Sequence, residues 1–276
     1  MNLSAVWLLS SKEMRDARRN RWFLVVSALF ALLSVSLSLL GLAGLGSLGI
    51  SGFGRTAASL LNLVLLIVPL MGLLLGAMSI AGEREQGTLV TLLAQPVTAQ
   101  EVFLGKYLGS ALALVSTILL GFGASALVIA RYAGAQEIGD YLKLVIFTML
   151  LGLSYLSLGF LASVFVRRQA TAVGSALFLW FTFVFLSDLG LMGSAIVLRF
   201  SPSELFWLVL INPAQSFKLA VVGALQKSLE SFGGAGLYAV DLFGPWLAAA
   251  LGAVLCVWIL APLGAALRFF GRRCAD

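Results

Sequence analysis

Residues 60–81 read LLNLVLLIVPLMGLLLGAMSIA and contain no charged side chain. A helix needs about 20 consecutive apolar residues to cross the hydrocarbon core of a bilayer, so this stretch is long enough to span a membrane. The composition of the whole chain agrees: of its 276 residues, 61% are hydrophobic and 11% are charged, and the mean hydropathy is +1.04. A soluble domain is nearer to half apolar and a quarter charged. The sequence therefore predicts a polytopic membrane protein.

Five further apolar runs, bounded by charged or turn residues, accompany the first. The fifth of the six is too long for one unbroken crossing, and Asp188, Gly190 and Gly193 indicate a break or an extension beyond the membrane near its end. We predict an all-α transmembrane domain at 22–270, preceded by an N-terminal helix at 1–21 and followed by a tail at 271–276. Its six spans are expected at about 22–43, 60–81, 107–130, 144–166, 170–198 and 245–270.

The positions of the basic residues predict the orientation of the spans. Twelve of the eighteen lysines and arginines fall in the N-terminal arm, in the loops at 82–106 and 167–169, and in the tail. Because loops rich in lysine and arginine stay in the cytoplasm, we expect both termini on the cytoplasmic side. The net charge of +6 reflects this topology and not nucleic-acid binding, because the chain has no long basic run or aromatic platform.

The N-terminal residues 2–21 are predicted to form an amphipathic helix, because apolar and charged residues separate at helical spacing. The helix either lies in the cytoplasmic interface against lipid head groups or serves only as a basic arm that sets topology. Its apolar stripe consists of Leu3, Val6, Trp7, Ser10, Met14 and Ala17, and its polar face of Lys12, Glu13, Arg15, Asp16, Arg19 and Asn20.

The loop after the second span reads GEREQGTLVTLLAQPVTAQE at 82–101. A short helix opens at Thr88 and stops at Pro96, and Thr98 with Glu101 forms a capping box for the next span. The apolar side of this short helix either docks a partner or packs against the cytoplasmic ends of the chain's own bundle. That side consists of Leu89, Leu92 and Leu93.

The connection before the last span is predicted to hold two short outer helices, at about 202–211 and 213–230. Ser201-Pro202-Ser203-Glu204 is a capping box with proline at the first helical position, and Asn212-Pro213 repeats that pattern less conventionally. The apolar side chains of these helices should lie in or dip into the outer interface. They are Phe206, Trp207, Phe217 and Val221.

Residues suited to catalysis or metal binding are sparse. The chain has no histidine, which removes Ser-His and Cys-His nucleophiles and His-ligated zinc. It has no G-x-x-x-x-G-K-[ST] motif, so any ATP and magnesium would bind a partner subunit. Met71, Met78 and Cys256 lack the close spacing of a copper relay and are interpreted as packing residues. We predict no catalytic residue, no metal site and no cofactor bound by this chain.

Two features lie within the predicted spans. Asp188 is the only acidic residue in a span, so it is either a candidate intramembrane polar site or a side chain solvated where the fifth span weakens. Gly72 and Gly76 form a small-x-x-x-small pair in the second span. Such pairs let two helix backbones approach closely, which favours a packed bundle over a pore.

Together these residues resemble the permease subunit of type-2 ABC transporters. The resemblance rests on Lys12-Glu13 with the basic residues before the first span, on the segments 83–89 and 92–97, and on Gly105-Lys106. It covers essentially the whole chain, because six spans, an N-terminal elbow helix and outer helices before the last span are also the plan of that family. Within the family, the sequence is most similar to the membrane subunit of the transporter that matures the copper site of nitrous oxide reductase.

The resemblance also implies partners and site residues. Residues 83–96 correspond to a coupling helix that docks on a separate cytoplasmic ABC ATPase, which supplies the ATP hydrolysis. Two copies of the chain are expected to pair in a bacterial inner membrane, with a periplasmic copper-handling protein as a further partner. The residues implied in ATPase coupling are Glu83, Arg84, Glu85, Gly87, Thr88, Leu89, Leu92, Leu93 and Pro96. The residues implied in the surface for the periplasmic partner are Phe206, Trp207 and Phe217.

Several functions remain open at this point. Without histidine and with dispersed sulfur ligands, the chain is expected to transmit motion to the periplasmic partner rather than to conduct copper or a sulfur species. The closest alternative is an ABC exporter of a lipid-like or drug-like molecule, which predicts a sizeable cavity and substrate-stimulated ATPase activity. An ATP-independent channel or a membrane-embedded enzyme would leave the capped helix in the loop at 82–106 without a role.

Overall fold

The computed structural model describes residues 3–43, 52–132, 135–197, 200–224 and 233–273. Every regular element within these residues is a helix, and six segments are long and apolar enough to cross a membrane. The predicted fold class, an all-α polytopic membrane protein with six spans, is therefore confirmed. The six candidate spans are Arg21–Gly41, Thr56–Glu85, Ala99–Leu127, Ile138–Phe165, Gln169–Leu191 and Tyr238–Arg272.

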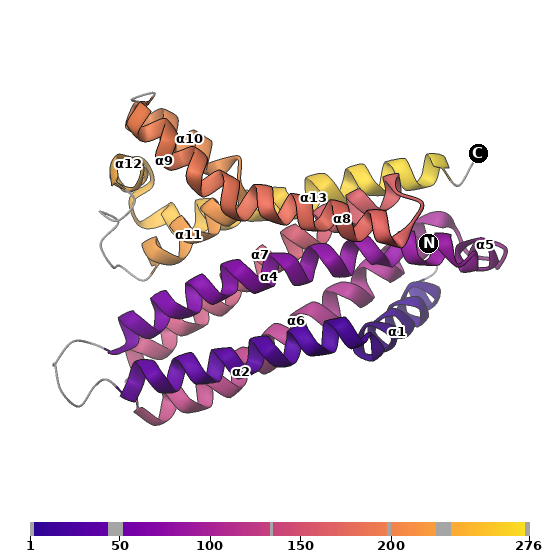
Figure 1. Cartoon of the computed structure of the whole chain (residues 1–276), viewed down its shortest axis with the longest axis horizontal. Coiled ribbons are helices and arrows are strands. Elements are labelled where there is room, and N and C mark those ends of the chain that lie inside the picture. The colour runs from indigo at the N-terminus through magenta and orange to yellow at the C-terminus, as the bar shows by residue number, and fades with distance from the viewer. Residues whose placement is uncertain (1–2, 44–51, 133–134, 198–199, 225–232, 274–276) are drawn as a thin grey trace.

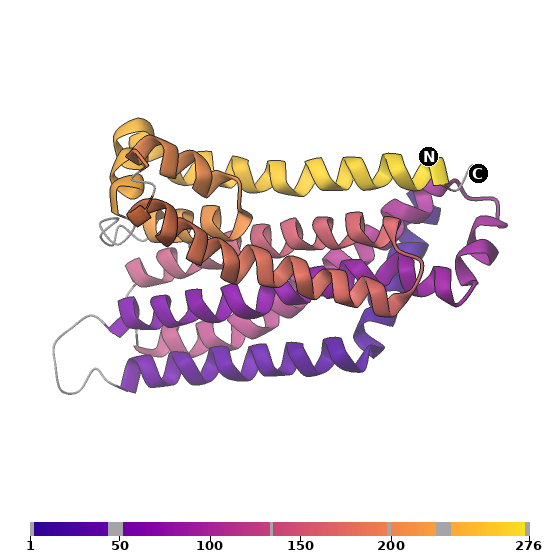
Figure 2. The same cartoon turned by 45° about the horizontal axis from the view of Figure 1, so that its top comes forward.

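The spans lie side by side, with α1, α5 and the end of α13 at one end of the bundle and α9 to α12 at the other (Figures 1 and 2). We call these the α5 end and the α12 end. The helices that form most of the spans are α2 (Arg21–Ala43), α4 (Gly52–Glu85), α6 (Ala99–Tyr132), α7 (Ala135–Phe165), α8 (Gln169–Phe181) and α13 (Leu247–Arg273). The other α-helices are α1 (Leu3–Arg19), α5 (Thr88–Leu93), α9 (Ser187–Val197), α10 (Pro202–Leu210), α11 (Pro213–Ala224) and α12 (Gly233–Phe243).

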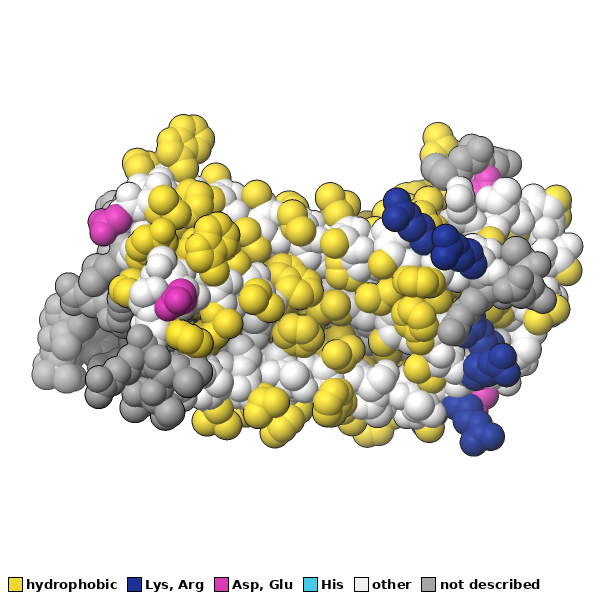
Figure 3. Space-filling view, turned by 90° about the horizontal axis from the view of Figure 1, so that it is seen from above, with side chains coloured by type: hydrophobic (Ala, Val, Ile, Leu, Met, Phe, Trp, Pro, Cys, Tyr) yellow, Lys and Arg dark blue, Asp and Glu magenta, His cyan; other side chains and the backbone are white. Residues whose placement is uncertain are grey.

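The surface has the polarity of a membrane protein. Figure 3 shows hydrophobic side chains over the middle of one face of the bundle, with lysine and arginine side chains gathered toward the α5 end. An apolar band of this kind suits the hydrocarbon core, and the charged end suits water and head groups.

The core of the bundle is the pair α4 and α7, whose backbones meet at glycines. A Cβ atom added at Gly76 would lie 2.5 Å from the carbonyl oxygen of Leu156, and one at Gly72 would lie 2.7 Å from that of Gly152. On α7, a Cβ at Gly159 would lie 2.6 Å from Leu73 O. The close helix approach predicted from Gly72 and Gly76 is confirmed, because no larger side chain fits between these backbones.

The amphipathic helix α1 packs its inner face on α6, again at glycines. A Cβ added at Gly109 would lie 2.5 Å from Ser10 O, so the two backbones are in direct contact. Trp7 on the predicted apolar stripe is 68% exposed. The structure corrects one assignment on this helix: Glu13, expected on the solvated polar face, is turned toward α6 and only 14% exposed.

The fifth span does not break at Asp188. Instead a π-helical segment, Thr182–Leu186, joins α8 to α9, and the helix continues to Val197. A π-helix leaves backbone groups out of the regular ladder. Here Asn212 Nδ2 donates to Phe183 O at 2.7 Å, so the loop between α10 and α11 satisfies one of them.

The two short helices before the last span form a bent pair, α10 and α11, with an angle of 113° between them. The predicted capping box at the start of α10 is confirmed: Ser201 N donates to Glu204 Oε2 and Glu204 N donates to Ser201 Oγ. Hydrogen bonds from the Ser201 backbone and side chain lower the pKa of the Glu204 carboxyl. The second helix ends at Ala224, and residues 225–230 of the expected helix lie outside the described part of the chain. Helix α12 was not predicted.

Candidate functional site

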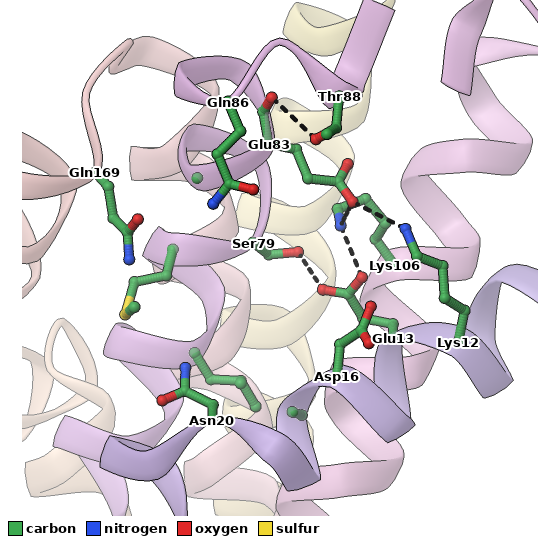
Figure 4. Close-up of a pocket in the computed structure, with 14 residues that line it drawn as sticks. Lys12, Glu13, Asp16, Asn20, Ser79, Glu83, Gln86, Thr88, Lys106 and Gln169 are labelled. Atoms are coloured by element: carbon green, nitrogen blue, oxygen red, sulfur yellow. Dashed lines mark hydrogen bonds and ion pairs between the residues drawn. The ribbon is translucent and has the colours of Figure 1, made fainter. Parts of the chain in front are cut away.

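A cluster of charged side chains joins three helices at the α5 end (Figure 4). Lys106 of α6 places its Nζ 2.7 Å from Glu13 Oε2 of α1 and 3.1 Å from Glu83 Oε1 of α4. Lys12 approaches the same Glu83 oxygen at 3.4 Å, and Ser79 donates to Glu13 Oε1 at 3.0 Å. We call Lys12, Glu13, Glu83 and Lys106 the ion cluster.

Burial makes the ion cluster costly to disturb. The Lys106 side chain is 3% exposed, and those of Glu13 and Glu83 are 14% and 16% exposed. Removing one partner of a buried pair leaves an uncompensated charge, whereas the complete set balances its own charges. The cluster therefore fixes the ends of α1, α4 and α6 relative to one another.

The next two charged residues extend these links to α7 and α8. Arg84 donates from Nη1 to the carbonyl oxygens of Val164 and Val166, both at 3.1 Å, where the last carbonyls of α7 lack helical partners. Glu85 Oε2 accepts a hydrogen bond from Gln169 N at 2.7 Å, at the start of α8, where a carboxylate favours the helix dipole. Glu83 and Arg84, which the sequence placed on a partner-facing surface, thus bind within the chain, while Glu85 remains exposed.

Helix α5 protrudes beyond this cluster. Gly87 adopts a positive φ of 73°, a conformation that side chains disfavour, and Thr88 Oγ1 donates to Glu83 O at 3.3 Å. After the helix, Thr98 N donates to Glu101 Oε2 at 2.9 Å and Glu101 N to Thr98 Oγ1 at 3.3 Å, so the predicted capping box is confirmed. The start of α5 is thereby tied to α4, and the capping box fixes the start of α6 a few residues beyond the end of α5.

The apolar residues of α5 divide between the bundle and the outside. Leu89 is 5% exposed and belongs to the chain's own core, and Leu92 and Leu93 are half-buried. Val90 is 74% exposed, and Pro96 is exposed. The predicted docking side therefore faces inward at Leu89, and Val90 is the outward apolar residue that the sequence reasoning missed. Successive residues of an α-helix are rotated by about 100° around its axis. With Leu89 facing the bundle, this rotation would have placed Val90 away from it.

A second polar site lies toward the α12 end, where Asp188 of α9 meets α11. Lys218 Nζ lies 2.7 and 2.6 Å from the two carboxylate oxygens of Asp188, and Gln215 Nε2 donates to the same group. The Asp188 side chain is 44% exposed and that of Lys218 21%. Asp188 is therefore paired as well as partly solvated. Gln215 and Lys218 share one face of α11 at i, i+3 spacing, which is the pattern that could have indicated this partner.

The structure corrects the predicted surface for a periplasmic partner. Phe206 is 1% exposed and Phe217 is 0% exposed, because both side chains pack in the core between the short helices and the spans. Trp207 alone of the three is outward, at 58% exposed. These apolar residues were expected in the outer interface, and two of the three pack in the interior instead.

No group of three or more His, Cys, Asp or Glu side chains that could hold a metal ion occurs in the described residues. The polar groups at both sites are instead arranged as ion pairs and hydrogen bonds between helices. Chemically, such an arrangement can hold or release helix ends.

Comparison with known proteins agrees with this arrangement. A family model described as "ABC-2 family transporter protein" matches residues 7–274. The chain is 37% identical to "Probable ABC transporter permease protein NosY" from Stutzerimonas stutzeri and also 37% identical to the protein of that name from Pseudomonas aeruginosa, each over 98% of this chain and 99% of the relative. It is 34% identical over 114 residues to "Probable multidrug ABC transporter permease YbhR" from Escherichia coli, covering 40% of this chain and 29% of that protein.

Proposed function

The chain belongs to the ABC-2 transporter family as a permease subunit, and on that premise we propose that it couples ATP hydrolysis by a separate cytoplasmic ATPase to movement across the membrane. In this proposal the α5 end faces the cytoplasm of a bacterium, both termini lie on that side of the inner membrane, and two copies pair around two ATPases. The observation that carries the proposal is α5 itself, a protruding helix with an exposed Val90, a buried Leu89 and a start that is bonded to α4.

The contacts of α5 explain how a push on it reaches the membrane. An isolated helix of six residues is unstable in water, so α5 owes its order to its attachments. Thr88 binds the end of α4, and the Thr98–Glu101 capping box begins α6. The ion cluster connects α1 to these two helices, and the hydrogen bonds of Arg84 and Glu85 connect α4 to α7 and α8. A displacement of α5 therefore acts on five helices together.

Replacing Val90 by aspartate is expected to weaken binding of the ATPase about tenfold or more, because an exposed apolar anchor at an interface would become a desolvated charge. Val90→Leu, which keeps an apolar contact, should bind as the native chain does. The measurement is the amount of ATPase subunit that copurifies with the full-length permease from cells expressing both. Equal recovery of ATPase with Val90→Asp and with the native chain contradicts docking at α5.

We further propose that the transporter serves maturation of the copper site of nitrous oxide reductase, which is the function implied by the NosY name of its full-length relatives. The chain lacks histidine, and its described residues form no metal-ligand group, which favours transmission of motion to a periplasmic copper-handling protein over transport of copper or a sulfur species. In this scheme the helices α10 and α11 move relative to the spans. The ion pair between Asp188 and Lys218 links α11 to the fifth span.

Replacing Asp188 by asparagine is expected to lower nitrous oxide reductase activity in cells about tenfold, within the usual range of coupling between distant sites. The change removes the counter-charge of Lys218 and so loosens α11 from α9, while ATPase recovery stays normal because α5 is untouched. The exchange variant Asp188→Lys with Lys218→Asp keeps the pair and should recover activity. Full activity of Asp188→Asn contradicts this role.

A second candidate function is export of a lipid-like or drug-like molecule. It is favoured by an apolar cavity of about 340 Å³ between α2, α4 and α8, and by the partial match to a permease named for multidrug transport. ATPase turnover of the reconstituted complex separates the two functions. Stimulation by added lipid-like compounds supports export, whereas stimulation only by the periplasmic partner supports transmission of motion.

A further inference from the structure

Two cavities meet at the α5 end of the bundle. One, of about 360 Å³, is lined largely by polar residues beside the ion cluster, and the other, of about 340 Å³, is apolar and lies between α2, α4 and α8. Asn20, Leu75 and Met78 line both cavities, so the two adjoin. The combined site is polar at the end of the bundle and apolar along the spans, which is the layout of a phospholipid.

The polar half presents hydrogen-bonding groups that the chain leaves unused. Figure 4 shows the side chains of Asn20, Gln86 and Gln169 directed into the same space. Asn20 Oδ1 accepts from Trp22 N and Phe23 N, which leaves its amide nitrogen for the cavity. Exposed Asp16 also lines this cavity and adds a carboxylate that can accept hydrogen bonds from an amine.

The apolar half continues from these groups into the membrane-spanning region. Phe23 and Val26 of α2, Met71 and Leu74 of α4, and Val173 of α8 line it. Trp22, 75% exposed, stands at its rim, where indole rings favour the boundary between head groups and hydrocarbon. An acyl chain placed here would bury apolar surface at the same depth as neighbouring lipid.

We propose that this site holds one phosphatidylethanolamine molecule as a resident ligand. Its ammonium group would donate to exposed Asp16, and its phosphate would accept from the amides and from Lys12. Lys12 and Lys106 face Glu13, Asp16 and Glu83 around the cavity, so the lining carries one more negative than positive charge. That balance favours a head group with an amine over an anionic one. The proposal does not depend on the ATPase or copper assignments.

Two neighbouring valines of α2 provide a matched test of the acyl-chain half. Val26 lines the cavity, whereas Val25 is 62% exposed and lies outside both cavities. The full-length chain is purified from vesicles of equal parts phosphatidylethanolamine, phosphatidylglycerol and phosphatidylcholine, and retained lipid is counted by native mass spectrometry. We expect one phosphatidylethanolamine per chain, reduced about tenfold by Val26→Trp, which fills the cavity, and unchanged in Val25→Trp.

A charge variant tests the head-group half. Asp16→Lys should remove the preference for phosphatidylethanolamine over phosphatidylglycerol, while Asp241→Lys at the α12 end, with the same change in charge, should preserve it. The proposal is overturned if the native chain retains the three lipids equally, if both tryptophan variants lose lipid equally, or if Asp16→Lys keeps the preference. It is also overturned if Val26→Trp breaks the pairing of two copies without changing lipid retention, because a second copy then fills the groove.

Discussion

Replacement of Lys106 by methionine is expected to destabilise the folded chain by about 3–5 kcal/mol, the usual cost of removing one partner from a buried ion pair. Its ammonium group lies 2.7 Å from Glu13 and 3.1 Å from Glu83, and its side chain is 3% exposed. Methionine fills a similar volume, so the loss comes from Glu13 left without its cation and from Glu83 left with Lys12 alone. In a heated sample followed by size-exclusion chromatography, the midpoint of unfolding should fall by roughly 10 °C.

A neutral version of the same cluster separates charge from packing. Lys106→Met combined with Glu13→Gln and Glu83→Gln removes the three buried charges and leaves only Lys12, whose side chain is 49% exposed and can be solvated. Replacing a whole buried ionic group by neutral residues is often tolerated. We expect this triple variant to recover most of the lost stability. If Lys106→Met alone unfolds at the native midpoint, or if the triple variant is no better than the single one, the ion cluster does not hold these helices together.

The ion cluster also marks where sequence reasoning about the site stops. The motif at 82–101 indicated a short helix, its stop and the next capping box, because each depends on residues only a few positions apart. The partners of Glu83 lie in α1 and α6, far away in sequence, and no local pattern pairs them. Glu13 was assigned outward because amphipathicity sorts residues by polarity, whereas a buried cation draws one acidic side chain inward.

The fold could be predicted further than the site, for a related reason. Hydropathy reports the free energy of placing a segment in lipid, so it located six spans in the chain. It does not report the path between spans. The π-helix at Thr182–Leu186, the 113° bend at α10 and α11 and the added helix α12 depend on tertiary contacts such as that from Asn212 to Phe183 O. These features surround Asp188, for which the sequence left two interpretations open: a polar site within the membrane, or a solvated side chain.

The close contact between α4 and α7 carries the other large expected effect. Replacing Gly76 by valine should destabilise the chain by about 3 kcal/mol or more, the upper range for overpacking, because the obstacle is backbone. A Cβ there would lie 2.5 Å from Leu156 O and 2.8 Å from Phe160 N, and neither atom can move without shifting α7. The yield of monodisperse protein extracted from membranes should therefore fall sharply relative to the native chain.

Gly264 of α13 provides the matched control, because a Cβ there meets no heavy atom within 4 Å. Gly264→Val makes the same chemical change in another membrane-spanning helix and should leave the yield near native. A loss of yield in both variants would mean that valine is harmful in any of these helices, and a normal yield in both would mean that α4 and α7 are not closely packed. Loss in Gly76→Val alone places the effect at the contact between two backbones. α4 carries Glu83 and Arg84 at its end. A bundle loosened at Gly76 would therefore also lose the rigid connection between α5 and the spans.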